Sequence, residues 1–333
     1  MKKVLFTTTA LVAFAGAASA EVTLSGYAEM GIIGSSGDET RFHNDIDVKF
    51  SLSGETDSGL SFGATIDLDE VGGGFDHNGN KSSVWISGGF GKLTLGDTDG
   101  ALDWAMQEVG IGSALTDDHT THAGFNFNSG ADGTYDGQVL RYDNTFGDFG
   151  VAVSAELDDS GVGDVAWGLG LKYNAALGGV DLGLGLGFQD DGTSTIIGLS
   201  VDAKFGSGFR AILNYSDLDG KAMGGTSAVN GTINPVTGVF TAGTAAIAGD
   251  AMDSHLGLGL GYTTGALTVS ANYGVYSAVA ANSDHTGYGL AVNYDLGGGA
   301  VVMAGYGHSK VDAGSANANT GSSTWSIGLG LSF

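Results

Sequence analysis

The sequence predicts an all-β fold, a transmembrane antiparallel β-barrel of sixteen strands. Glycine accounts for 61 of the 333 residues against a single proline, and the glycines alternate with Leu, Val, Tyr and Phe instead of forming a low-complexity tract. No stretch beyond the first twenty residues approaches the roughly 18 to 20 apolar residues of a membrane-spanning helix. Alternation with a period of two indicates strands that have one apolar face.

The chain begins with a pattern typical of a secretory signal peptide. Two lysines precede an apolar stretch, and the letters ASA at 18–20 form a small-residue cleavage site before Glu21. We therefore expect residues 1–20 to be removed and residues 21–333 to form the barrel. Without the two lysines the formal charge of −25 becomes −27. A strongly acidic chain with no basic stripe argues against nucleic acid as a partner.

Segments with period-two alternation recur along residues 21–333. The first, 22–32, alternates apolar or small side chains with mostly polar ones, and the second sets Ile46 and Val48 opposite Asp45, Asp47 and Lys49. Leucine alternates with glycine in later segments such as 182–188 and 256–262. We count about sixteen such segments, each near the ~9 to 11 residues that cross a bilayer as a tilted strand.

The connections between these segments alternate in length. Short turns are expected at 54–59, 88–91, 144–150, 174–179, 206–208, 264–266 and 295–299, and longer polar connections at 71–80, 98–137, 217–254 and 309–321. A barrel with tight turns on one rim and loops on the other produces this asymmetry. An even number of strands places both ends on the tight-turn rim, so the strand that ends at Phe333 is expected to pair with the first.

Two other all-β folds fit the pattern less well. A soluble β-sandwich rarely carries Gly, Ser, Asn and Asp on its solvent face over so many strands, whereas a water-filled lumen tolerates small and polar side chains. A calcium-binding solenoid needs a repeated G-G-x-G-x-D motif, and its nearest match, GGGFDHNG at 72–79, occurs once.

The segments EVTLSGYAEMGI, TDSGLSFGATI, SGGFGKLTLGD, LRYDN, YDLGGGA and the terminal GLGLSF resemble strand and turn motifs of the general porins of Gram-negative bacteria, above all the Rhodobacter-type porins. The resemblance keeps its order over essentially all of residues 21–333. It implies a sixteen-stranded, trimeric barrel in the outer membrane, in contact with lipid and lipopolysaccharide. It also implies a third long loop that folds inward and narrows the pore.

The predicted third loop spans about residues 98–137. Within it, DGALDWAMQEVG at 99–110 has the apolar spacing of a short amphipathic helix. The resemblance implies that carboxylates of this loop face basic side chains on the opposite wall of the pore. The acids at and after the start of this loop are Asp97, Asp99, Asp103, Glu108, Asp117 and Asp118.

The sequence departs from the family where porins of this group place arginines on the first strands. Glu29, Asp45 and Asp47 stand there instead, and only Lys49 and Arg141 remain as inward cations near that level. A lumen with net negative charge enriches cations and repels anions. We therefore expect a passive channel for small hydrophilic solutes and ions that prefers cations.

Two other functions are alternatives to this channel. A sugar-selective channel needs aromatic side chains along the lumen, and the inward positions supply few, such as Tyr27 and Trp85. A plugged barrel that acts as an adhesin or anchor is the other alternative. No catalytic motif is found, so an enzyme is not expected. No cofactor is expected either; the loop acids offer the oxygen ligands of a structural calcium, but without a ligand spacing.

Overall fold

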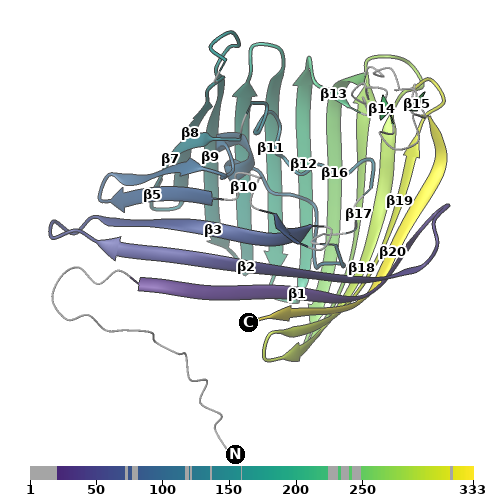
Figure 1. Ribbon diagram of the computed structural model, residues 1–333, viewed down its shortest axis with the longest axis horizontal. Helices are drawn as coiled ribbons and strands as arrows, with labels where there is room; N and C mark the ends of the chain where they lie inside the picture. Colours follow the sequence, from purple (N-terminus) through teal and green to yellow (C-terminus); the bar gives the residue numbers. More distant parts are fainter. Residues whose placement is uncertain are drawn as a thin grey trace, which may run out of the picture.

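In the computed structural model, the chain forms one antiparallel sheet that closes into a barrel (Figure 1). The structure describes residues 21–71, 74–76, 82–116, 120, 122–135, 137–158, 160–223, 232–233, 240–241, 249–315 and 318–333. The sheet contains 18 strands, of which β4 (Gly74–Asp76) and β13 (Ala222–Met223) are short additions. The wall is formed by β1 (Glu21–Ser35), β2 (Arg41–Glu55), β3 (Ser61–Val71), β5 (Ser82–Gly88), β6 (Gly91–Gly96), β7 (Val139–Phe146), β8 (Phe149–Glu156), β9 (Ala166–Leu177), β10 (Val180–Asp190), β11 (Thr195–Phe205), β12 (Phe209–Asp219), β16 (Asp250–Thr264), β17 (Leu267–Ala278), β18 (His285–Gly297), β19 (Ala300–Val311) and β20 (Asn319–Ser332).

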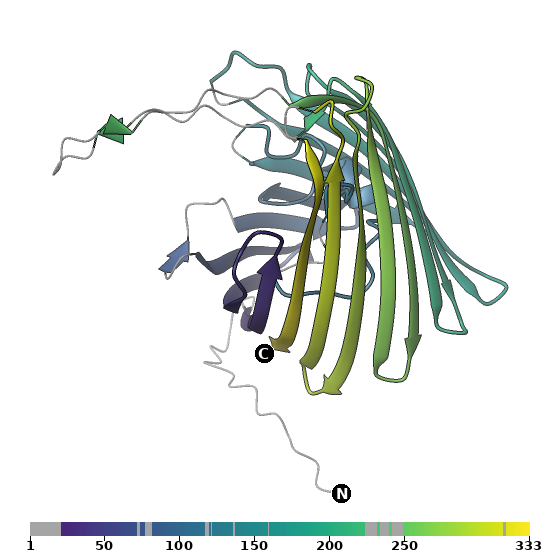
Figure 2. The ribbon, with the colours of Figure 1, turned by 90° about the vertical axis from the view of Figure 1, so that its right-hand side faces the viewer.

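The first and last strands close the barrel. β1 pairs with β20 from Tyr27 opposite Ser332 to Ser35 opposite Thr324. The backbone of Phe333 continues the pairing, since its N–H donates to the carbonyl of Gly26 at 2.8 Å. In Figures 1 and 2 the end of β20 lies beside β1. The predicted sixteen-stranded barrel and its closure by the C-terminal strand are therefore confirmed.

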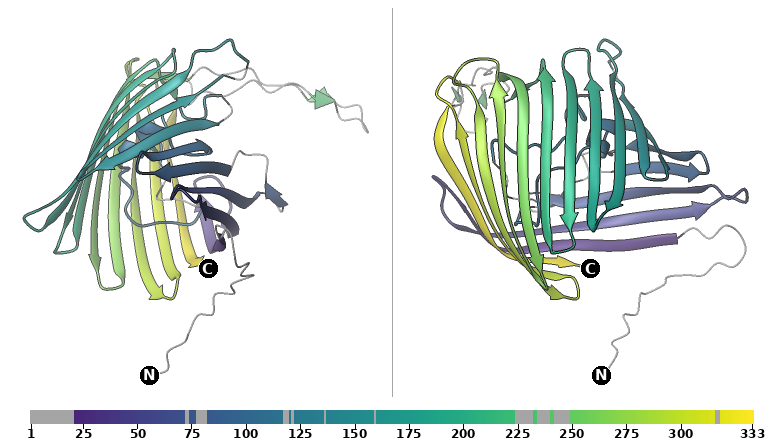
Figure 3. Two further views of the ribbon diagram at one scale, coloured as in Figure 1. Left: turned by 90° about the vertical axis from the view of Figure 1, so that its left-hand side faces the viewer. Right: turned by 180° about the vertical axis from the view of Figure 1, so that it is seen from behind.

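Tight turns join the strands in pairs along one rim. The turn between β9 and β10 consists of Gly178 and Gly179, whose φ angles of 61° and 88° favour glycine. Six other pairs, β2–β3, β5–β6, β7–β8, β11–β12, β16–β17 and β18–β19, are joined by connections of similar kind. The strands β9 to β12 and β16 to β20, drawn from teal to yellow, form a continuous tilted wall when seen from behind (Figure 3).

The two faces of the sheet differ in chemistry. On one face, called the apolar face here, Leu186, Leu258 and Leu260 expose 46%, 44% and 63% of their surface. On the other, called the polar face, glycines and small polar residues alternate with them; Gly259, for example, is buried between Leu258 and Leu260. Apolar side chains exposed on strand after strand are what a bilayer requires of a barrel, and they confirm the alternation predicted from the sequence.

The part of the chain that the structure describes has no helix long and apolar enough to span a membrane. Its one α-helix, α1 (Ala101–Ala105), lies between β6 and β7. Two further short strands, β14 (Thr232–Ile233) and β15 (Phe240–Thr241), pair with each other in the long connection between β12 and β16. β12 ends at Asp219 and β16 begins at Asp250, so this connection is shorter than the expected 217–254. The predicted signal peptide, residues 1–20, lies outside the described residues.

Candidate functional site

The segment 97–138, which joins β6 to β7, lies against the polar face of the sheet. α1 buries Ala101, Leu102 and Ala105 against β8, β9 and β10. Its first turn is fixed by two side chains, because the N–H of Gly100 donates to Asp132 at 2.6 Å and that of Ala101 donates to Ser154 at 2.8 Å. The segment occupies nearly the bounds predicted for the third loop.

Glycines of the polar face let the backbone of this segment approach the sheet closely. A Cβ atom at Gly185 would overlap the carbonyl oxygen of Ala105, and one at Gly274 would overlap that of Gly124. The same holds for Gly170 against Ala101. The close approach of the segment backbone to the strands therefore explains many of the glycines on this face.

Polar side chains between these glycines hold the segment in place. Ser200 on β11 accepts from the N–H of Gln107 at 2.8 Å, and Asn214 on β12 donates to its carbonyl at 2.9 Å. Asn293 on β18 accepts from the N–H of Ser113 at 2.9 Å and donates to its carbonyl at 2.8 Å. Backbone groups that would otherwise be buried without partners are thus satisfied by the wall.

Apolar contacts complete the interface between segment and wall. One cluster joins Leu102 and Met106 to the buried side chains of β11, β12, β16 and β17, and another surrounds Val109, Ile111 and Phe125. Both contain side chains that are at most 8% exposed. Both of these buried apolar clusters therefore lie between this segment and the polar face.

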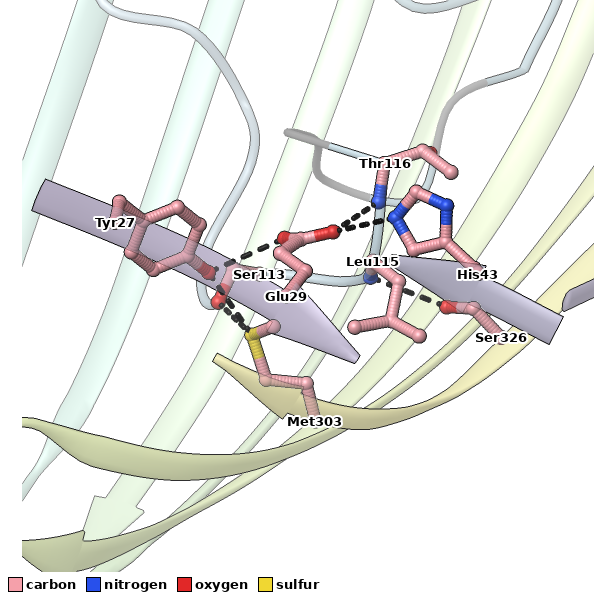
Figure 4. Close-up of polar contacts among 8 residues, drawn as sticks. All are labelled: Tyr27, Glu29, His43, Ser113, Leu115, Thr116, Met303 and Ser326. Carbon is pink, nitrogen blue, oxygen red and sulfur yellow. Dashed lines mark hydrogen bonds and ion pairs between the residues drawn. The ribbon is translucent and has the colours of Figure 1, made fainter. Parts of the chain in front are cut away.

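Glu29 anchors the middle of the segment, at Thr116 (Figure 4). Glu29 is 3% exposed. Its carboxylate accepts hydrogen bonds from the N–H of Thr116 at 2.6 Å and from the hydroxyl of Tyr27 at 3.2 Å. Nε2 of His43 lies 3.0 Å from the same carboxylate. The N–H of Leu115 donates to Ser326 on β20 at 3.2 Å, so the anchor spans the seam at which the barrel closes.

The return half of the segment follows the same wall back to β8. Nε2 of His122 lies 2.7 Å from the amide oxygen of Asn272 on β17, and burial lowers the pKa of this histidine. The N–H of Ala131 donates to Gln189 on β10 at 2.7 Å. The N–H groups of Gly133, Tyr135 and Gly137 all donate to Glu156 at the end of β8.

Carboxylates gather where the segment begins. Burial raises the pKa of Asp103 to about 8, and the charges of Asp99, Glu108 and Asp132 raise it further. Burial also raises the pKa of Asp132 to about 6, although hydrogen bonds from Gly100 and Gln189 to its carboxylate oppose the rise. Both carboxyl groups therefore change charge near neutral pH.

Two basic side chains of the wall lie beside this carboxylate group. Arg141 on β7 donates to the carbonyl of Asp99 at 2.5 Å and to the carboxylate of Asp143 at 3.1 Å. Lys172 on β9 places its ammonium 4.1 Å from the ring centroid of Trp104 on α1. The start of the segment thus combines several acids with two cations.

The predicted site residues on β1 and β2 share the polar face. Asp45 lies opposite Glu29 in the strand register, and Asp47 lies opposite Tyr27. Oδ2 of Asp45 has no hydrogen-bond partner among the described residues. Lys49 forms an ion pair of 3.0 Å with Asp67 on β3. Asp45, Asp47 and Lys49 therefore lie side by side on the polar face of β2.

Of the remaining predicted site residues, two lie in the described part of the segment and two do not. The N–H of Asp97 donates to Ser82 at 2.9 Å as the segment leaves the sheet, and Glu108 follows α1. Asp117 and Asp118 lie outside the described residues. Within the described ranges, no group of three or more His, Cys, Asp or Glu side chains is arranged to hold a metal ion.

Sequence reasoning missed Asp132, Glu156, Gln189 and Lys172, which complete the start and return of the segment. Glu156 is the last residue of β8, Gln189 is the last but one of β10, and Lys172 lies within β9. Their signal is positional, because each occupies the polar face of an alternating strand. Asp132 lies within the segment itself and has no such signal.

The comparisons with known proteins agree with this geometry. The model of the Gram-negative porin family matches residues 7–314. A porin of Rhodobacter capsulatus is 32% identical over 300 residues, which cover 86% of this chain and 93% of the relative. The chain belongs to the Gram-negative porin family. Membership in this family implies a channel in the outer membrane, and the matched relatives are porins, which are passive channels and not enzymes.

Solved porin structures share the fold. A porin structure refined at 1.8 Å resolution superimposes with a TM-score of 0.66 at 27% identity and covers 94% of this chain and 100% of its own. An engineered variant of the Rhodopseudomonas blastica porin has a TM-score of 0.62 at 18% identity, with the same coverage, and shows the fold alone. The porin barrel therefore extends over nearly the whole chain.

Proposed function

We propose that this porin is a passive, water-filled, cation-preferring channel for small hydrophilic solutes and ions, and that the segment 97–138 lies inside the barrel and narrows it. The segment contacts the polar face at β8, β11, β17, β18 and β20 and reaches Glu29 on β1. A single segment can contact the polar face of so many strands of a closed barrel only if it lies inside the barrel. This is the support for a constriction at the predicted third loop.

The charges along the segment support the preference for cations. Asp99, Asp103, Glu108 and Asp132 belong to the segment, and two further acids, Glu29 and Glu156, bind its backbone near its middle and near its C-terminal end. Against these six acids, of which Asp103 is mostly neutral at pH 7, stand Arg141, Lys172 and Lys221, whose ammonium donates to the carbonyl of Gly130. A narrow, low-dielectric passage with such an excess of carboxylates concentrates cations. This excess is the single observation that carries the proposal.

The polar face of β2 is part of the proposed path. Asp45, Asp47 and Lys49 lie on this face. Because Lys49 is paired with Asp67, its charge is largely compensated. The two aspartates therefore add to the negative potential along the path.

Three further features are proposed on the resemblance to porins. Residues 1–20 act as a signal peptide that is removed on export. The mature chain assembles as a homotrimer. Its apolar face contacts outer-membrane lipid and lipopolysaccharide, in keeping with the exposed leucines of the strands.

Planar-bilayer recordings test the proposed function. Purified protein is expected to produce discrete conductance steps, and the dilute side of a KCl gradient is expected to become positive at zero current. A double variant, Asp99→Asn with Glu108→Gln, is expected to reduce this potential, whereas Asp57→Asn at a tight turn is a matched control. Absence of steps, or a potential that favours chloride, would contradict the proposal. Block by one sugar would favour the substrate-selective alternative.

A further inference from the structure

Two buried histidines hold the return half of the segment at Gly124. His122 of the segment is 5% exposed, and His255 of β16 is 1% exposed. The N–H of Gly124 donates to Nδ1 of His122 at 3.2 Å, and Nε2 of His255 donates to the carbonyl of Gly124 at 3.0 Å. His122 and His255 are called the histidine pair here. One belongs to the segment and one to the wall, and together they bind both backbone polar groups of a single glycine.

The hydrogen bonds of the histidine pair keep both imidazoles neutral. Nδ1 of His122 accepts a hydrogen bond and its Nε2 lies 2.7 Å from the amide oxygen of Asn272, so the ring proton is on Nε2. The ring proton of His255 is also on Nε2, because a carbonyl oxygen can only accept. Nδ1 of His255 is buried and has no hydrogen-bond partner among the described residues. A second proton would therefore remove the acceptor of Gly124 at His122, and at His255 it would leave a charged N–H buried without an acceptor.

The two rings are packed among uncharged groups. The ring centroids of His255 and Tyr276 are 4.4 Å apart, and those of His122 and Phe125 are 5.8 Å apart. A Cβ atom at Gly287 would lie 2.5 Å from Nδ1 of His122, so this glycine makes room for the ring. Burial lowers the pKa of His122. Close packing thus opposes a positive charge at this place.

The titratable groups that face the histidine pair come from four elements. They are Tyr276 on β17, His285 on β18, Asp250 on β16 and Glu108 in the segment, whose charge acts on Tyr276. Asp250 is bound to His285 in an ion pair of 3.0 Å. At the same level β12 and β19 present Ser216 and Ser309. The hydrogen bonds of the pair itself are made with uncharged partners, Gly124 and Asn272.

Docking of the return half is therefore linked to pH. A hydrated imidazole has a pKa of about 6.5. The docked segment keeps both rings neutral, so its release takes up a proton at each ring when the pH is below that value. Docking is at full strength above about pH 6.5, and it weakens up to about tenfold per histidine for each unit that the pH falls below it.

We propose that the histidine pair is an acid-sensitive switch: below about pH 5.5 the return half leaves the wall at Gly124 and enters the passage, and the channel conducts less. The wall lies behind the return half, so the released backbone moves toward the lumen. The inference rests on the proposed open channel and adds a regulation of its constriction.

Single-channel recordings between about pH 7.5 and 4.5 test the switch, in about 1 M KCl so that changes of fixed charge are screened. Conductance of the parent protein is expected to fall reversibly below about pH 6, to about half or less at pH 4.5. A double variant, His122→Gln with His255→Gln, keeps a donor and an acceptor at each position but does not titrate. Compared with its own value at pH 7.5, its conductance is expected to change little. His308→Gln on the apolar face of β19 is the matched control and is expected to keep the acid response.

A thiol placed under the return half reports its release directly. Thr120 is 4% exposed and accepts a hydrogen bond from Asn272, so Thr120→Cys supplies a buried thiol in a chain without other cysteines. Its reaction rate with a water-soluble thiol reagent is divided by that of Ser51→Cys, which corrects for the effect of pH on the reaction. This ratio is expected to rise about tenfold or more between pH 7 and 5.

A conductance that does not change down to pH 4.5, or that falls equally in the double variant, would overturn the inference. A constant labelling ratio would do the same, because the segment then stays docked in acid. Loss of the acid response in His285→Gln alone would assign the titration to the ion pair with Asp250 and would also overturn it. Absence of conductance steps at pH 7.5 would instead count against the proposed channel itself.

Discussion

The buried carboxylate of Glu29 accepts a 2.6 Å hydrogen bond from the backbone N–H of Thr116. This bond ties the middle of the 97–138 segment to β1, which closes the barrel by pairing with β20. Thr116 has a φ angle of 79°, a conformation that is costly for a β-branched residue. The hydrogen bond that Thr116 donates to Glu29 helps to offset that strain. The same carboxylate also binds His43, so β1, β2 and the segment meet at one side chain.

Loss of this anchor is expected to loosen the segment. Glu29→Ala leaves the N–H of Thr116 without its acceptor, at a cost of about 1 to 3 kcal/mol, so open-channel current is expected to become noisier in single-channel recordings. Glu29→Gln keeps an amide oxygen at the same place and is expected to remain close to the parent protein. Equally quiet currents in the alanine variant would show that Glu29 does not hold the segment.

The glycines under the segment give a second prediction. A Cβ atom at Gly274 overlaps the carbonyl oxygen of Gly124, so Gly274→Ala must displace the segment from the wall. Because the displaced backbone moves toward the proposed passage, single-channel conductance is expected to fall. At Gly183, also on the polar face, an added Cβ lies 3.3 Å from its nearest neighbour, the side-chain oxygen of Asn174. Gly183→Ala is therefore the matched control, and equal conductance in both variants would refute the close packing.

The raised pKa of Asp103 predicts that the ion selectivity of the channel depends on pH. Its pKa is about 8, so the carboxyl group is mostly neutral at pH 7 and becomes charged as the pH rises through 8. The folded state binds this proton more tightly than the unfolded chain does, so its contribution to stability falls as the pH rises from the ordinary pKa of an aspartate, 3.8, toward about 8. Above that pH the constriction gains a negative charge. Cation preference, measured as the zero-current potential, is expected to increase between about pH 7 and 9.

Asp103→Asn is the variant that isolates this step. It removes the titrating group while it keeps a side chain of the same size, so the increase near pH 8 is expected to disappear. The step from Asp132, whose pKa is about 6, is expected to remain. An identical pH profile in the parent and the variant would assign the titration to another residue.

The barrel was predictable from the sequence because its signal is local. Leu258 and Gly259 alternate on one strand, and alternation alone assigns them to opposite faces. The pairing of the last strand with the first followed from an even strand number and the need to leave no free edge in lipid, and the structure adds that Phe333 pairs with Gly26. The bounds of the third loop followed from the strands on either side.

The contacts of the segment were not predictable in the same way. Glu29 was expected on the polar face as a lumen charge, but its bond to Thr116 joins residues far apart in the sequence. Asp132 lies within the segment with no periodic pattern around it, and only the fold brings it to Gly100 and Gln189. A glycine such as Gly274 signals a strand of the polar face, whereas the backbone that presses on it appears only in three dimensions.

The central claim is that the apolar face meets hydrocarbon while the polar face encloses water. Ser51 and Leu52 are neighbours on β2 and point to opposite faces, and the chain has no cysteine of its own. With the protein in lipid vesicles, Ser51→Cys is expected to react quickly with a charged, water-soluble thiol reagent, and Leu52→Cys is expected to be protected. Equal reaction rates at the two positions, or faster reaction at Leu52→Cys, would contradict the account.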